Sequence, residues 1–521
     1  MAHCLHDPMR PAPTMGYRTT ALTRLRVWLR ARSALVFFFI CLAVVAAVSK
    51  EPWLPTFALT WAAYRPRSAG SRLFNCKRDV RVSTHFGAED MSDTQAEADV
   101  DREDGREGWE VIVLLCALGI MISYADRSNI SIAIIGMAAD FQWDKAFEGT
   151  VLSAFFGGYA GTQLLGGQLA DALGAKWVLA GGLSCWSLAT ALTPLAAAWG
   201  ALPLLATRLA LGLGEGVAFP AVHSAIGRLV PREKQSSAVA LVTAASYAGA
   251  GLAFLLVPGL IQAYGWQVSF FGFGALALLW LPPWLLQDVP SGRSSGATAD
   301  WSPSKLQKSF GDTLEELLPL MKTPEVLAIC AAQYTNGFGL YGLLSWLPTF
   351  FSEQYGISLS ELPALTTVPY VLQALVGLAV GAAADRALAQ GLSVGLVRKT
   401  LQTVGMLVPA VALLVAASPM TKDPSTAGLL VDLGLAANAL TLGAVSVNHL
   451  DVAPRHAGAI FGLGNTFATL AGLVSTPLTG FLLDRTGSWE VVFSVITLHY
   501  VVGALAFVAF AGETPLKEDQ S

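Results

Sequence analysis

Long apolar stretches recur along this 521-residue chain and constrain its fold more than any other feature. From residue 111 onward each is about 20 residues or longer, and Gly, Pro and charged residues separate them. A helix of about 20 residues crosses the hydrocarbon core of a bilayer. The sequence therefore predicts twelve membrane-spanning helices, at 111–139, 150–170, 177–198, 202–222, 238–262, 267–287, 326–350, 363–384, 398–418, 427–448, 457–482 and 490–511.

Composition and motifs favour a membrane protein without enzymatic activity. Hydrophobic residues make up 54% of the chain and charged residues 13%, about half the charge of a soluble protein. The six cysteines have no CxxC or CxxH spacing, so no metal site is expected. The HExxH motif of metal-dependent hydrolases is absent from the sequence. We expect no cofactor, no nucleic-acid partner and a monomer in the lipid bilayer.

The basic residues between the spans predict the topology. With residue 111 on the inner side, the inner loops hold twelve Lys and Arg residues and the outer loops hold three, Lys145, Lys422 and Arg485. Positive residues gather on the side that is not translocated. The asymmetry supports both the number of spans and their orientation.

The chain divides into five predicted regions. Residues 1–110 form a targeting presequence with an acidic tail, residues 111–287 a six-helix half, and residues 288–325 a polar inner linker. A second six-helix half occupies 326–513, and a tail occupies 514–521.

The presequence contains two kinds of targeting segment. Segment 24–49 is signal-like, with arginines before an apolar run that ends in small residues, and segment 50–88 is transit-like, rich in Arg and poor in acids. This order is similar to the bipartite presequence of algae with secondary plastids, which implies an inner plastid envelope membrane. An anchor helix followed by a basic loop is the alternative, with an endomembrane or plasma-membrane location.

The two halves repeat each other. The interval from Lys176 to Pro231 is 55 residues, and so is the interval from Lys399 to Pro454. An insertion of nine residues between 385 and 399 accounts for the remaining difference, so an offset of 223 relates the halves after it. Two parallel six-helix halves are the architecture of a major facilitator transporter. The fold class is therefore an all-α membrane protein with this fold.

Five charged residues lie inside the predicted spans: Asp126, Arg127, Arg208, Glu215 and Asp432. An arginine at the bilayer centre costs about 2.5–3.5 kcal/mol on insertion scales, so each needs a partner or a function. Arg208 and Glu215 are seven residues apart on one helix face, roughly 10.5 Å along the axis, which is too far for direct contact.

We expect Glu215 to pair with Arg127 on the first span. Two guanidinium groups and one carboxylate would leave a net positive site, which suits a phosphate or carboxylate anion. Protonation of Glu215 would free the arginine for substrate, so Glu215, with Asp126, is the candidate coupling group. A permanent structural ion pair is the alternative.

The glycines around Glu215, in ALGLGEG, predict close helix packing rather than a nucleotide site, because no strand precedes them. Charged residues near the inner ends of the helices are candidate gate or loop contacts. They are Asp171, Lys176, Asp385, Arg386, Arg398, Asp451 and Arg455.

Several longer strings resemble the anion:cation symporter family of the major facilitator superfamily. They are YADRSNISIAI at 124–134, GGQLADALGAKWVL at 166–179, RLALGLGEGVAFPAVHSAIGRLVP at 208–231, VNHLDVAPR at 447–455 and TGSWEVVF at 486–493. The DRSN string at 126–129 and VRKTLQTVG at 397–405 are most similar to the plant plastid phosphate branch.

The resemblance implies a transporter, with Arg127, Arg208 and Glu215 at positions that the family uses for anion binding and coupling. The vesicular glutamate branch has a histidine where Leu152 stands and an arginine where Asn336 stands, which argues against glutamate. We assign Asn336 and Tyr341 to the substrate site. Ala172 replaces the arginine that usually follows Asp171, which puts the usual ion-pair role of that loop in doubt.

The resemblance implies symport of inorganic phosphate with Na⁺ or H⁺ by alternating access. One alternative is an organic-anion transporter for ascorbate, a sugar acid or a dicarboxylate. Another is a sensor that has kept the fold but does not transport.

Overall fold

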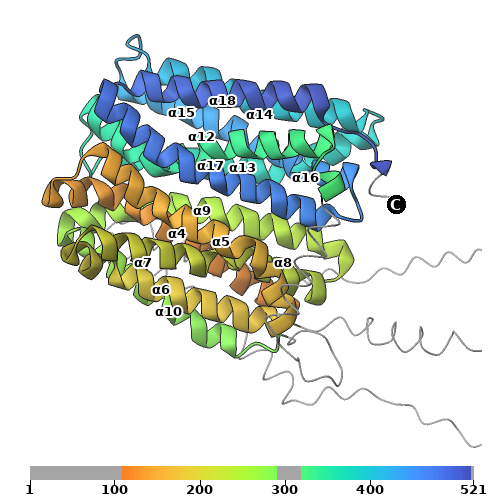
Figure 1. The fold of residues 1–521 in the computed structure, drawn as a ribbon, viewed down its shortest axis with the longest axis horizontal. Coiled ribbons are helices and arrows are strands. Elements are labelled where there is room, and N and C mark those ends of the chain that lie inside the picture. The colour runs from red at the N-terminus through yellow and green to blue at the C-terminus, as the bar shows by residue number, and fades with distance from the viewer. Residues whose placement is uncertain (1–107, 290–317, 518–521) are drawn as a thin grey trace, which may run out of the picture.

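The computed structural model describes residues 108–289 and 318–517. The signal-like and transit-like segments lie outside the described residues, as does most of the predicted linker. Figure 1 shows the described part as two layers of roughly aligned helices. One layer, coloured orange to green, is built from the first half of the chain, and the other, coloured green to blue, from the second half.

In the first half, all six predicted spans are helical, with boundaries within seven residues of those expected. The helices are α4 (Trp109–Phe141), α5 (Lys145–Leu173), α6 (Ala175–Trp199), α7 (Ala201–Gly216), α8 (Ala218–Leu229), α9 (Arg232–Tyr264) and α10 (Trp266–Leu285). The fourth span is broken, because α7 ends at Gly216 and α8 begins at Ala218.

The second half repeats this order. Its elements are α12 (Pro324–Tyr355), α13 (Leu362–Ala389), α14 (Val394–Ala417), α15 (Pro424–Asn438), the 3₁₀ helix η1 (Ala439–Gly443), α16 (Val445–Val452), α17 (Ala457–Thr486) and α18 (Trp489–Phe510). The tenth span is broken between α15 and α16. With the offset of 223 residues, this break falls at the position that corresponds to the end of α7.

Polar side chains start several helices where the apolar runs begin. The carboxylate of Asp144 accepts a hydrogen bond from the backbone N–H of Phe147 at the start of α5. At the start of α15 the carboxylate of Asp423 accepts a hydrogen bond from the backbone N–H of Thr426. Hydrogen bonds from the backbone and side chain of Thr426 hold the pKa of Asp423 below its usual value. Such caps satisfy backbone donors that the first helical turn leaves without partners.

The two halves meet through two pairs of helices. α5 packs against α17, and α9 packs against α13, with a smaller contact between α4 and α12. The repeat relates α5 to α13 and α9 to α17, so the two pairs are equivalent. The centre of the molecule therefore lies between α4, α5 and α7 on one side and α12, α13 and α15 on the other.

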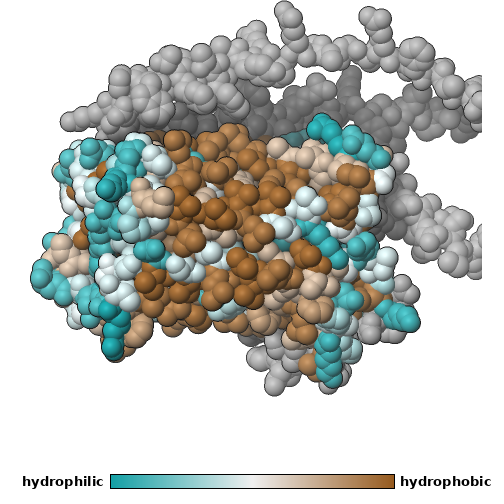
Figure 2. All heavy atoms as spheres, turned by 90° about the horizontal axis from the view of Figure 1, so that it is seen from above, coloured by the Kyte–Doolittle hydropathy of each residue, from teal (hydrophilic) through white to brown (hydrophobic). Residues whose placement is uncertain are grey.

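The outer surface of the helices matches a bilayer. Figure 2 shows a broad apolar band between two polar ends. Within the described residues, ten helices or broken helix pairs are long and apolar enough to span a membrane. The other two predicted spans are α5 and α12, whose small and polar residues pack largely against other helices. The structure is that of an integral membrane protein.

Candidate functional site

An ion pair joins α4 to α7 inside the first half. Nη2 of Arg127 lies 2.9 Å from Oε2 of Glu215, and Nε of Arg127 donates to the same oxygen at 3.3 Å. The two residues are 5% and 1% exposed, so the pair is shielded from solvent. The pairing predicted from the sequence is confirmed.

The second buried arginine, Arg208, has N–H donors without hydrogen-bond partners among the described residues. Arg208 is 1% exposed, and its Nε and Nη1 have no hydrogen-bond partner in the described structure. Nη1 of Arg127 and Oε1 of Glu215 are also buried without a partner. Buried donors without partners are costly, so these groups mark a place where an acceptor-rich ligand would be stabilised.

Asp126 changes the charge expected for this cluster. It is 1% exposed, and one carboxylate oxygen accepts a hydrogen bond from the hydroxyl of Thr190 in α6. Asp126 and Glu215 are both near enough to Arg208 for their carboxyl groups to interact with it electrostatically. The expectation of a net positive site counted one carboxylate, whereas in the structure two guanidinium groups face two acidic side chains. Neighbouring helix positions point about 100° apart, which directs Asp126 to α6 and Arg127 to α7.

Three aromatic rings enclose the guanidinium of Arg127. Its Cζ atom lies 4.5 Å from the ring centre of Tyr124, 4.4 Å from that of Phe155 and 4.7 Å from that of Tyr159. Cζ of Arg208 lies 5.9 Å from the same Phe155 ring. The sequence analysis missed these rings, although Phe155 and Tyr159 stand four apart and so share one face of α5.

Glycines bring α5 and α7 together at this level. A Cβ atom at Gly212 would overlap the carbonyl oxygen of Phe155, and one at Gly158 would overlap that of Leu209. Gly214 faces α6 instead, where a Cβ would lie 2.7 Å from the carbonyl oxygen of Gly182. The packing role predicted for the glycines around Glu215 is confirmed.

In the second half, amides occupy the corresponding place. Asn438 stands at the position related to Glu215, at the end of α15. Its Nδ2 donates to Oδ1 of Asn336 at 2.6 Å, and Nε2 of Gln373 donates to its Oδ1 at 3.4 Å. Oε1 of Gln373 is buried without a partner. In membrane transporters built from two repeats, interrupted helices at matching positions typically form the substrate site.

The structure separates the two residues assigned to the substrate site in α12. Asn336 belongs to the amide cluster of the second half. The ring of Tyr341 instead lies 4.8 Å from that of Phe156, the residue that follows Phe155. Before the nine-residue insertion the repeats differ by 214 residues, which relates Tyr341 to Arg127.

The loop residues join helix ends within one half. Nε of Arg398 lies 2.9 Å from Oδ2 of Asp451, linking α14 to α16, and Nζ of Lys176 donates to the carbonyl of Gln287 at 2.7 Å. Asp385 and Arg386 are exposed at the end of α13, with no ion pair among the described residues. The side chain of Asp171 lies outside the described part, and Arg455 lies between α16 and α17.

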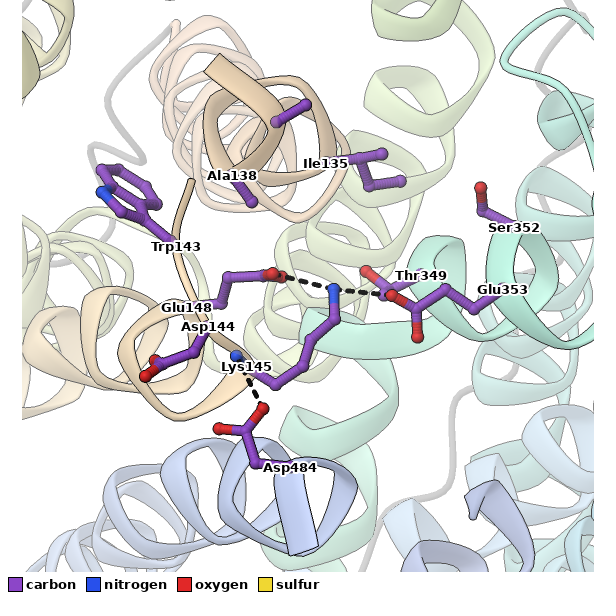
Figure 3. Close-up of a pocket in the computed structure, with 11 residues that line it drawn as sticks. Ile135, Ala138, Trp143, Asp144, Lys145, Glu148, Thr349, Ser352, Glu353 and Asp484 are labelled. Carbon is purple, nitrogen blue, oxygen red and sulfur yellow. Dashed lines mark hydrogen bonds and ion pairs between the residues drawn. The ribbon is translucent and has the colours of Figure 1, made fainter. Parts of the chain in front are cut away.

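A network at the outer end joins the two halves (Figure 3). Nζ of Lys145 lies 2.8 Å from Oε1 of Glu148 in α5 and 2.6 Å from Oε1 of Glu353 in α12. The carboxylate of Asp484 in α17 accepts the backbone N–H groups of Lys145 and Ala146 at 3.0 and 2.7 Å. The topology had placed Lys145 in a loop; it is the first residue of α5.

These side chains line a cavity of about 420 Å³. Within the described residues, no group of three or more His, Cys, Asp or Glu side chains is placed to hold a metal ion. Beside the cavity α5 and α17 are in backbone contact, since a Cβ at Gly149 would lie 2.7 Å from the carbonyl oxygen of Thr476. Toward the inner end, Gly167 of α5 and Gly458 of α17 face open space. At the outer end, contacts between α5, α12 and α17 thus hold the two halves together.

Residues 116–476 match the family described as Major Facilitator Superfamily. The chain is 35% identical to "Probable anion transporter 4, chloroplastic" of Oryza sativa subsp. japonica, over 78% of this chain and 69% of that protein. It is also 35% identical to two Arabidopsis thaliana proteins, "Ascorbate transporter, chloroplastic" and "Sodium-dependent phosphate transport protein 1, chloroplastic". These matches cover 77% of this chain and 74% and 78% of the relatives.

Solved structures share the fold at low identity. A D-xylose-proton symporter superposes with a TM-score of 0.62 at 17% identity, covering 78% of this chain and 98% of that one. A bacterial homolog of the human lysosomal transporter Spinster, inward-facing and occupied, gives 0.61 at 17% identity, covering 77% and 96%.

Proposed function

This chain belongs to the major facilitator superfamily and is a membrane transporter, and we propose that its substrate is inorganic phosphate, moved together with Na⁺ or H⁺ across a plastid membrane. The relatives named as chloroplastic anion and phosphate transporters support this substrate class and location. The predicted presequence at 1–110 is consistent with the same destination.

The observation that carries the proposal is the buried arginine pair with unused donors. Arg127 and Arg208 lie in spanning helices, and three of their N–H-bearing nitrogens have no partner. Because Cζ of each lies close to the Phe155 ring, at 4.4 and 5.9 Å, the two guanidinium carbons are within about 10 Å of each other. A single oxyanion placed between them would accept hydrogen bonds from both guanidinium groups.

The two acids supply the coupling. With Asp126 and Glu215 ionised, the four-residue cluster is neutral and has little attraction for an anion. A proton or Na⁺ bound to either acid leaves the cluster with one positive charge, so cation and anion binding favour each other. Glu215 is the better candidate, because neutralising it also releases Nε and Nη2 of Arg127 for the substrate.

Alternating access then requires the outer end to open. At this end Lys145, Glu353 and Asp484 join α5 to α12 and α17, and these contacts support a closed outer end. Rocking of one half against the other would separate these residues and expose the arginine pair to the outer side.

An organic anion is the second candidate, because the amides of the second half offer hydrogen bonds to hydroxyl groups. Asn336, Gln373 and Asn438 form that cluster, and a relative of the same identity is named an ascorbate transporter. Phosphate has no carbon chain with hydroxyl groups, so it would leave these amides without a substrate contact.

The test is uptake of radiolabelled phosphate into proteoliposomes under imposed H⁺ or Na⁺ gradients, with unlabelled ascorbate and dicarboxylates as competitors. We expect accumulation above equilibrium that one gradient drives and that excess phosphate suppresses. Uptake of labelled ascorbate with no phosphate uptake would replace phosphate by the organic anion. Lys422→Ala, an exposed charge change between α14 and α15, is the matched control and should behave as the wild type.

A further inference from the structure

A single phenylalanine ring contacts both buried arginines. Cζ of Arg127 lies 4.4 Å from the ring centre of Phe155, and Cζ of Arg208 lies 5.9 Å from it. The face of an aromatic ring carries partial negative charge and attracts a guanidinium group. Phe155 is therefore a neutral contact shared by two cations that would otherwise repel each other.

The ring has little freedom to move. Phe155 is 1% exposed, and its ring packs 5.2 Å from that of Phe156 and 5.5 Å from that of Tyr159. Its backbone is fixed as well, because its carbonyl oxygen lies against Gly212 of α7, where no Cβ would fit. Close-packed interiors transmit such constraints to their neighbours.

We infer that Phe155 is a positioning residue that sets the spacing between Arg127 and Arg208 and thereby selects for a small oxyanion. With hydrogen bonds of about 2.8 Å on each side, an anion of phosphate size would bridge guanidinium carbons roughly 8 Å apart. That spacing lies within the limit of about 10 Å set by the two contacts to the ring. A larger anion that bridged both groups would need the two guanidinium carbons farther apart.

The role differs from ordinary core packing in what it predicts. A packing role requires volume, which a leucine or methionine largely supplies. A positioning role requires the ring face, which tyrosine keeps and leucine lacks. Ring-less variants should therefore bind phosphate more weakly and discriminate less against larger anions, while the fold and the turnover rate are preserved.

The inference rests on the proposed function, so the experiment begins by comparing Phe155→Leu, Phe155→Met and Phe155→Tyr with the wild type. Phe270→Leu is the matched control, since Phe270 is also fully buried but packs on Trp266 in α10. Each protein is checked for a single monodisperse species in detergent and reconstituted in equal amount. KM and Vmax for phosphate are measured, together with the inhibition constant of ascorbate.

We expect Phe155→Leu and Phe155→Met to raise KM for phosphate about tenfold with Vmax within about threefold, and to lower the preference for phosphate over ascorbate. Phe155→Tyr and Phe270→Leu should keep KM within about twofold.

Unchanged KM and preference in both ring-less variants would overturn the inference, as would an equal loss in Phe155→Tyr. A wild type that carries ascorbate but not phosphate would refute the proposed substrate and the small-anion selection, while the tyrosine comparison would still test the spacing role. If the wild type carries neither anion, the shift in thermal midpoint on adding phosphate is measured in place of KM. The absence of such a shift would overturn both proposals.

Discussion

Removing the contacts that close the outer end should shift the transporter toward its outward-open form. Only contacts between the halves matter for this equilibrium. Lys145 binds Glu148 within α5, and that pair is retained when the halves separate, whereas Glu353 and Asp484 belong to the other half. The double variant Glu353→Gln/Asp484→Ala therefore removes the inter-half part of the network.

The magnitude follows from exposure and geometry. The side chains of Lys145 and Glu353 are 26% and 40% exposed, so their ion pair contributes about 0.2–1 kcal/mol. Asp484 accepts two backbone N–H groups at the start of α5, an interaction similar to a helix cap worth about 0.5–2 kcal/mol. Together they favour the closed outer end by about 1–3 kcal/mol, which is roughly a 5- to 150-fold change in the population ratio.

The assay is the rate at which a membrane-impermeant thiol reagent labels a cysteine introduced at Thr349, which is 1% exposed and lines the outer cavity. We expect the double variant to label at least about fivefold faster than its parent. Glu148→Gln is the matched control, because it removes a partner of Lys145 within the same half, and it should not speed labelling. Equal acceleration by Glu148→Gln, or none by the double variant, would refute the assignment of the closing contacts.

Three further changes test other parts of the structure. Glu215→Gln should retain phosphate exchange but lose gradient-driven accumulation, and full accumulation would exclude it as the coupling group. Gly212→Ala should lower the thermal midpoint in detergent, by about 1–3 kcal/mol of stability, because its Cβ would overlap the carbonyl oxygen of Phe155, while Gly227→Ala, which meets nothing within 4 Å, should not. Asp144→Ala removes the cap of α5 and should cost about 1 kcal/mol; an unchanged midpoint would show that the cap is dispensable.

The fold was predictable because its main determinant is local. Apolar runs long enough to cross a bilayer appear directly in the sequence, and the equal spacing from Lys176 to Pro231 and from Lys399 to Pro454 reveals the repeat. The breaks at the ends of α7 and α15 were not predicted, because both lie inside continuous apolar stretches. The offset of 223 residues, which relates Glu215 to Asn438, shows that the two breaks correspond.

The candidate site was predictable in part. A buried arginine needs an acidic partner, and this requirement alone identified Arg127 with Glu215. The contribution of Asp126 to the cluster and the contacts of Phe155 depend on how three helices pack, which spacing along the chain does not give. Lys145 was placed in a loop because the predicted span began with the apolar run. Capping by Asp144 and the contact of Lys145 with Glu353 extend α5 beyond that run.

Gradient-driven phosphate uptake by Arg208→Ala tests the central claim most directly. Arg208 is buried with unused donors, so its removal takes away one of the two groups that would hold the anion. We expect a fall of at least about 100-fold in kcat/KM, equivalent to about 3 kcal/mol, in a protein that remains monodisperse. Uptake by Arg208→Ala within about twofold of the wild type would show that the buried arginine pair does not bind the transported anion.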